Sequence, residues 1–113
     1  PERYPRPVLF DVRVLPVGVR SELAVVGEID LATMPLLRQE LDRVDADAVA
    51  LDLGGVDYVD PVSLGVIVSG SLRARRRGGR FAVVCPPGPA RDLLAESGLD
   101  RIVTVVDASS DLG

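Results

Sequence analysis

The sequence contains no histidine and no lysine, so all thirteen of its basic residues are arginine. Histidine is the usual general base in enzymes and lysine is the usual Schiff-base nucleophile, so two common routes to catalysis are missing. A G-x-x-x-x-G-K-[ST] phosphate loop, a G-x-G-x-x-G turn and a Cys/His metal spacing are also absent. We therefore expect a protein that is not an enzyme, with no catalytic residues, no cofactor and no metal site.

Cysteine and long apolar runs are scarce as well. The single cysteine, Cys85, lies in the apolar run FAVVC, which predicts a small core residue in a reducing compartment. No apolar run approaches the roughly 20 residues that a membrane span needs, and the first residues, PERYPRP, show no signal pattern. These features predict a cytoplasmic protein without a membrane span.

The charge balance argues against a nucleic-acid partner, because the net charge is -4 and phosphate binding depends on clustered cations. One basic cluster, from Arg73 to Arg80, falls at the end of a predicted helix. Cations there complement the helix dipole, so we interpret the cluster as a solvated helix end.

Length and patterning predict a single domain over residues 1–113 with its core at about 8–106. Hydrophobic residues make up 47% and aromatic residues only 4%, so valine, leucine, isoleucine and alanine must fill the core. The spacing of these residues predicts strands over 8–15, 22–29, 48–53, 80–85 and 102–106 and helices over 34–45, 61–77 and 89–98.

The fold class predicted from this order is α/β, with a single mixed sheet of about five strands and helices packed on it. The short connection between the first two strands implies an antiparallel pair, and alternation with helices makes the later strands parallel. Thr33 and Asp60 are predicted N-caps, and Gly78 with Gly79 is predicted to end the second helix.

In open sheets of this kind, functional groups gather beyond the carboxyl ends of the strands. Here that rule selects residues 27–33, 54–63 and 86–89, which are predicted loops. The acidic residues in the first two loops are Glu28, Asp30, Asp57 and Asp60.

Four segments in order, GEIDLAT, VALDLGGVDYVD followed by SLGVIV, RRRGGRFAVV, and LLAESGLDRIV, resemble the STAS domain of bacterial anti-sigma factor antagonists. The resemblance covers residues 8–106. It implies a protein that binds a kinase-type anti-sigma factor and so releases a sigma factor. In that family the second helix typically starts with Asp-Ser-Ser-Gly-Leu-Gly, and phosphate on the second serine breaks the complex.

This chain departs from the family pattern at the helix start. Asp60 matches the aspartate, while Pro61 and Val62 stand in place of the two serines. The first reading is that Val62 makes the chain refractory to the kinase. The second is that Ser63, one position along, accepts the phosphate, although roughly 100° of helix rotation separates the two positions. In the third, the domain is a STAS scaffold or a transporter-associated subunit.

The partner-binding surface that we predict combines a few acids with an apolar centre at the start of the second helix. Its residues are Glu28, Asp30, Thr33, Asp60, Val62, Ser63 and Gly65. An alternative is that Glu28, Asp30, Asp57 and Asp60 hold Mg²⁺ in an enzyme or a receiver-like domain. The oligomeric state cannot be deduced from the sequence.

Overall fold

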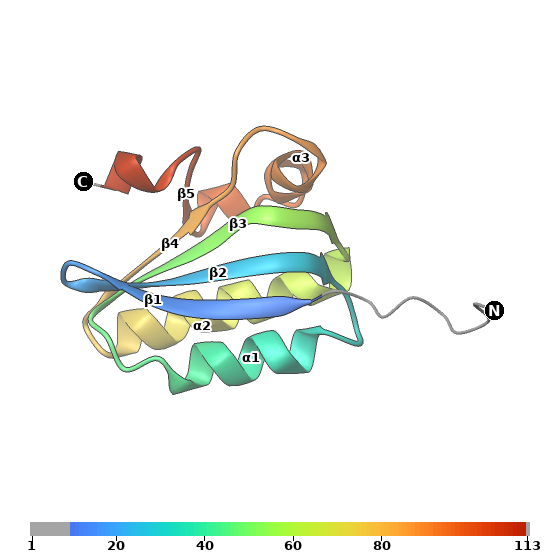
Figure 1. Ribbon diagram of the computed structural model, residues 1–113. Coiled ribbons are helices and arrows are strands. Elements are labelled where there is room, and N and C mark those ends of the chain that lie inside the picture. The colour runs from blue at the N-terminus through green and yellow to red at the C-terminus, as the bar shows by residue number, and fades with distance from the viewer. Residues whose placement is uncertain (1–9, 113) are drawn as a thin grey trace.

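A computed structural model of the chain describes residues 10–112, which form one five-stranded sheet with helices on both faces (Figure 1). The strands are β1 (Asp11–Val17), β2 (Arg20–Ile29), β3 (Ala48–Val59), β4 (Arg80–Val84) and β5 (Thr104–Val106). The α-helices are α1 (Met34–Arg43), α2 (Leu64–Arg76) and α3 (Pro89–Glu96). The strands lie in sequence order, with β1 antiparallel to β2 and all other pairs parallel. The predicted fold class is confirmed.

Several predicted boundaries were wrong. The first strand runs from Asp11 to Val17 instead of 8–15, of which residues 8 and 9 lie outside the described residues. The last strand begins only at Thr104, because Leu99–Arg101 form a 3-10 turn, η2. The first helix ends at Arg43, two residues early.

The largest error concerns β3, which was predicted to end at residue 53 but continues to Val59. The two glycines at 54 and 55 interrupt the apolar pattern, yet the strand continues through them, with one register shift against β2 at the glycines and a second after Val56. One of these shifts leaves Asp57 without a β2 partner, because Gly27 pairs with Val56 and Glu28 with Tyr58. Such bulges redirect side chains near functional sites.

The helices divide the molecule into layers: α1 and α2 lie together on one face, and α3 lies on the other (Figure 1). The core is aliphatic, and its fully buried members include Leu23, Leu51, Ile67 and Leu94. Cys85 is also buried, as predicted, and this burial raises the pKa of its thiol. Its role is therefore packing.

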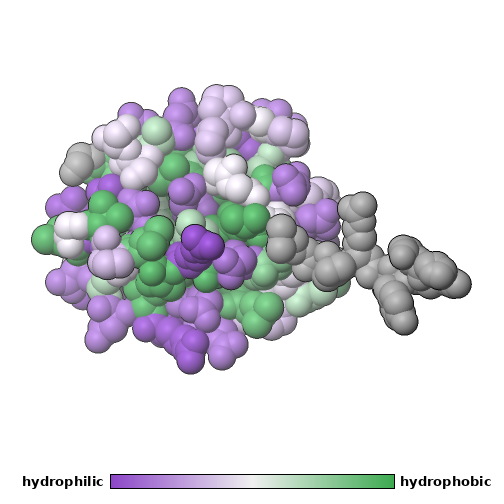
Figure 2. All heavy atoms as spheres, in the orientation of Figure 1, coloured by the Kyte–Doolittle hydropathy of each residue, from purple (hydrophilic) through white to green (hydrophobic). Residues whose placement is uncertain are grey.

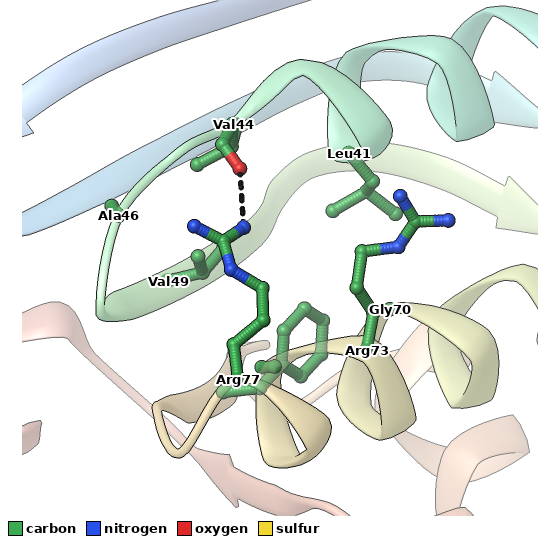
Figure 3. A pocket seen from close by; sticks show the side chains of 9 residues that line it. Leu41, Val44, Ala46, Val49, Gly70, Arg73 and Arg77 are labelled. Atoms are coloured by element: carbon green, nitrogen blue, oxygen red, sulfur yellow. Dashed lines mark hydrogen bonds between the residues drawn. The ribbon is translucent and has the colours of Figure 1, made fainter.

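The basic cluster closes the carboxyl end of α2. Gly78 adopts a left-handed conformation, and the N–H of Gly79 donates to the Ala74 carbonyl (2.8 Å), so the predicted glycine cap is confirmed. Arg77 donates to the Val44 carbonyl (3.1 Å), and Arg73 pairs with Asp42 (2.8 Å). Figure 3 shows these two arginines bordering an apolar cavity of about 20 Å³ between α1 and α2. They hold the two helices together.

β1 forms one edge of the sheet, and hydrophobic side chains are exposed over it in Figure 2. Val14, Leu15 and Val17 are all exposed, while Pro16, Asp11 and Arg13 make the strand a poor template for pairing with another chain. Within residues 10–112, no helix has the length and apolar character needed to cross a membrane.

Candidate functional site

Two loops come together where β2 and β3 end. Ile29 and Val59 are register partners, and the N–H of Asp60 donates to the Ile29 carbonyl (2.8 Å). Residues 30–33, which lead into α1, therefore lie beside residues 60–63, which lead into α2 (Figure 1). We call residues 28–33 and 60–65 together the strand-end surface.

The first loop is held by Asp30 and Thr33. One carboxylate oxygen of Asp30, Oδ1, accepts the N–H groups of Ala32 (2.9 Å) and Thr33 (3.0 Å). The Thr33 hydroxyl donates to the Glu28 carbonyl (2.7 Å) and accepts the N–H of Asp30 (3.0 Å). Thr33 occupies the predicted N-cap position, but its side chain makes no capping bond to the helix. Asp30 supplies the loop contacts instead, because its carboxylate lies within reach of two successive N–H groups.

The second loop begins with the cap that the sequence predicted. Asp60 Oδ1 accepts the N–H of Val62 at 2.9 Å, so this N-cap is confirmed. It caps a 3-10 turn, η1 (Pro61–Ser63), and α2 starts only at Leu64. The predicted helix start at Pro61 is thus one 3-10 turn too early for the α-helix.

The 3-10 turn gives neighbouring side chains opposite environments. Val62 is 68% exposed, although it is apolar, while Ser63 is fully buried. The Ser63 hydroxyl has no hydrogen-bond partner among residues 10–112. A buried hydroxyl without a partner costs about 1–3 kcal/mol. A kinase could not reach this hydroxyl in the folded chain, so Ser63 as phosphoacceptor stays a prediction that would need the turn to open.

Glu28 and Gly65 complete the strand-end surface. Glu28 is exposed at the end of β2, and Gly65 is exposed in the first turn of α2. A Cβ atom built on Gly65 would meet nothing within 4 Å. Internal packing therefore gives no reason for glycine there, although glycine costs a helix about 1 kcal/mol relative to alanine.

The acidic residues do not converge on a metal site. Between residues 10 and 112 no group of three or more His, Cys, Asp or Glu side chains is placed to hold a metal ion. The alternative in which Glu28, Asp30, Asp57 and Asp60 gather as magnesium ligands is therefore not supported by their placement. Asp30 and Asp60 each accept backbone N–H groups through one carboxylate oxygen, and Asp57 lines a groove beside α3.

Sequence reasoning missed three exposed apolar residues near this edge of the sheet. Leu31 is 61% exposed in the first loop, Leu36 is exposed in the first turn of α1, and Tyr58 is exposed near the end of β3. Hydropathy alone does not distinguish these residues from core residues, because only their position in the fold leaves them exposed.

Comparison with known proteins decides the family. The model of the family described as "Mlab, STAS domain" matches residues 16–106. An "Anti-sigma F factor antagonist" of Paenibacillus polymyxa is 31% identical over 85 residues, which cover 72% of this chain and 73% of that protein. The chain belongs to the STAS-domain family of anti-sigma factor antagonists.

Solved structures agree with this assignment of the STAS domain. The crystal structure of an anti-sigma factor antagonist from Mycobacterium paratuberculosis superposes with a TM-score of 0.85 at 26% identity, covering 94% of this chain and 92% of that one. SpoIIAA, an anti-sigma factor antagonist solved in its unphosphorylated form, gives a TM-score of 0.71 at 13% identity, covering 92% and 93%. At that identity the likeness to SpoIIAA shows the shared fold alone.

Proposed function

We propose that this STAS domain captures an anti-sigma factor and so releases a sigma factor, acting by docking and without chemistry of its own. The strand-end surface would be the contact, with acids that orient the partner and an apolar centre that supplies buried area. The observation that carries the proposal is the exposed Val62 in the second of two loops, which the Asp60–Ile29 hydrogen bond holds side by side.

The valine at position 62 supports binding of the anti-sigma factor that is not controlled by phosphorylation of this chain. It stands where the family resemblance places the phosphoacceptor serine, and its side chain offers no hydroxyl. At the neighbouring position the Ser63 hydroxyl is buried, so the folded chain presents no acceptor between Asp60 and Gly65. The partner switch in this protein would then depend on the amounts of the partners and not on a phosphate carried by the antagonist.

Binding to the kinase-type anti-sigma factors of the source organism, each purified singly, tests the capture. Calorimetry is expected to find one that binds the chain, and adding the chain is expected to release the sigma factor from that complex. Failure of every anti-sigma factor to bind, together with recovery of transporter subunits in a pull-down, would instead favour the scaffold or transporter reading.

Incubation with ATP and that kinase, followed by mass spectrometry, tests the role of Val62. We expect no phosphate on the natural chain and phosphate on residue 62 of the Val62→Ser variant, because the substitution restores a hydroxyl at an exposed helix start. Phosphate on Ser63 of the natural chain would contradict the proposal. Val62→Thr is the matched variant, because threonine keeps the branched shape of valine and adds only the hydroxyl.

A further inference from the structure

A groove runs beside the strand-end surface, between the end of β3 and α3. Its volume is about 380 Å³. Tyr58, Ala90 and Leu93 give it an apolar lining, and Tyr58 is about half exposed there. Pro61, which opens the second loop, also lines it, so the groove continues directly from the strand-end surface.

The charges along this groove have a single sign. Asp57, Asp92 and Glu96 line it, and none of the arginines between residues 10 and 112 does. The ion pairs and side-chain hydrogen bonds found within the described residues do not involve these three carboxylates. The groove therefore combines an apolar wall with uncommitted negative charge.

Helix stability does not explain the position of Glu96. It is the last residue of α3, where a carboxylate faces the negative end of the helix dipole. An acid there costs a helix about 0.3–1 kcal/mol, whereas Asp92 in the first turn is favourable. Asp57, in turn, lines the groove from the bulge that leaves it unpaired with β2. Two of the three acids thus lie where local structure gives them no stabilising role.

We propose that this groove binds a segment of the anti-sigma factor in which an arginine or lysine lies beside an aliphatic side chain. This inference rests on the proposed function and extends its contact from the strand-end surface onto α3. The aliphatic side chain would pack against Tyr58 and Leu93, and the cation would meet Asp92 and Glu96. Because both carboxylate positions are solvent-exposed, the attraction should weaken with added salt.

Amide shifts of the ¹⁵N-labelled chain, recorded by NMR with three synthetic peptides of equal length, test this chemistry. One peptide presents Arg beside Leu, the second has Glu in place of Arg, and the third has Ser in place of Leu. At millimolar concentration only the first is expected to shift Tyr58, Ala90 and Leu93. No shift from the first peptide, or equal shifts from the Glu peptide, would overturn the proposal.

Two double variants with the same change in net charge make the test specific. Asp92→Asn with Glu96→Gln removes two groove carboxylates, while Asp47→Asn with Asp100→Asn removes two exposed carboxylates that do not line the groove. The first pair is expected to abolish the peptide shifts and to weaken anti-sigma factor binding roughly tenfold, and the second to change neither.

The outcomes separate this inference from the proposed function. If the anti-sigma factor binds the natural chain, and the groove variant binds it equally well, the groove is not part of the interface although the function stands. If the Arg-Leu peptide shifts the groove but no anti-sigma factor binds, the function fails and the occupant named here is wrong.

Discussion

The strand-end surface and the opposite end of the parallel strands use their polar groups in different ways. At the opposite end, Arg73 pairs with Asp42, Arg77 reaches Asp45 and the Val44 carbonyl, and the glycine cap satisfies the last carbonyls of α2. At the strand-end surface, by contrast, none of the ion pairs found within residues 10–112 involves an acid of either loop. Charged side chains at the opposite end therefore pair with one another, whereas the acids of the strand-end surface form no ion pair among residues 10–112.

This contrast indicates where stability has been given up. The strand-end surface holds a buried hydroxyl that has no partner among residues 10–112, an exposed valine and an exposed helical glycine, each of which a fold optimised for stability would replace. Local rules are most often broken where function requires it. The two ends should therefore respond to substitution in opposite ways.

Gly79→Ala at the arginine-rich end of α2 is expected to have the largest effect. A Cβ atom on Gly79 would lie 2.2 Å from the Asp47 carbonyl oxygen, which also accepts the N–H of Arg80. Relieving this clash must displace the backbone, so we expect the free energy of unfolding to fall by about 3 kcal/mol. Urea denaturation followed by circular dichroism measures it, and a loss below about 0.5 kcal/mol, the usual range for a surface substitution, would show that this end is not tightly fixed.

Val62→Asp is expected to break the other end without unfolding it. A carboxylate at the centre of the strand-end surface would remove apolar contact and imitate phosphate, so anti-sigma factor binding should weaken roughly 30-fold, or about 2 kcal/mol. Calorimetry measures the affinity. Val19→Asp is the matched control, since Val19 is a 93% exposed valine in the turn at the far end of the sheet. Equal losses in the two variants would point to net charge as the cause.

The sequence predicts the sheet well and the strand-end surface only in part. Strand order and direction follow from short links and alternating elements, and the Asp-Pro pair at 60 and 61 correctly predicts a cap. The extension of β3 to Val59 could not be read from Gly54 and Gly55, because its continuation depends on pairing with β2. The length of β3 is therefore set by its hydrogen bonds to β2 and not by the local propensity of its residues.

The environments of Val62 and Ser63 were equally hard to predict. An α-helix starting at Pro61 and a 3-10 turn followed by α2 rotate these side chains differently about the axis. The hydrogen bond from Asp60 to Ile29 fixes where the turn begins, and it joins residues distant in sequence. The sequence could therefore supply the residues of the surface but not which of them are exposed.

Ser63→Ala is expected to stabilise the chain, because it removes a buried hydroxyl that has no partner among residues 10–112. The gain in unfolding free energy should be about 1 kcal/mol. Ser110→Ala is the matched control, because Ser110 is an exposed serine in another 3-10 turn, Ser109–Leu112. Thermal and urea denaturation of both variants give the difference. If Ser63→Ala loses stability, the hydroxyl has a partner and the cost assigned to its burial is absent.

Gly65→Ala is expected to have the smallest effect and to show the trade between stability and binding most directly. The position has open space around it, so alanine should raise the free energy of unfolding by about 0.5–1 kcal/mol through helix propensity. If the partner packs closely over the start of α2, the added methyl group should at the same time weaken anti-sigma factor binding several-fold. The same substitution at Gly79 destabilises the fold, so the two glycines should change stability with opposite signs. A Gly65→Ala variant that gains stability and keeps its full affinity would place the partner elsewhere on the strand-end surface, and glycine at this helix start would then have no explanation in binding.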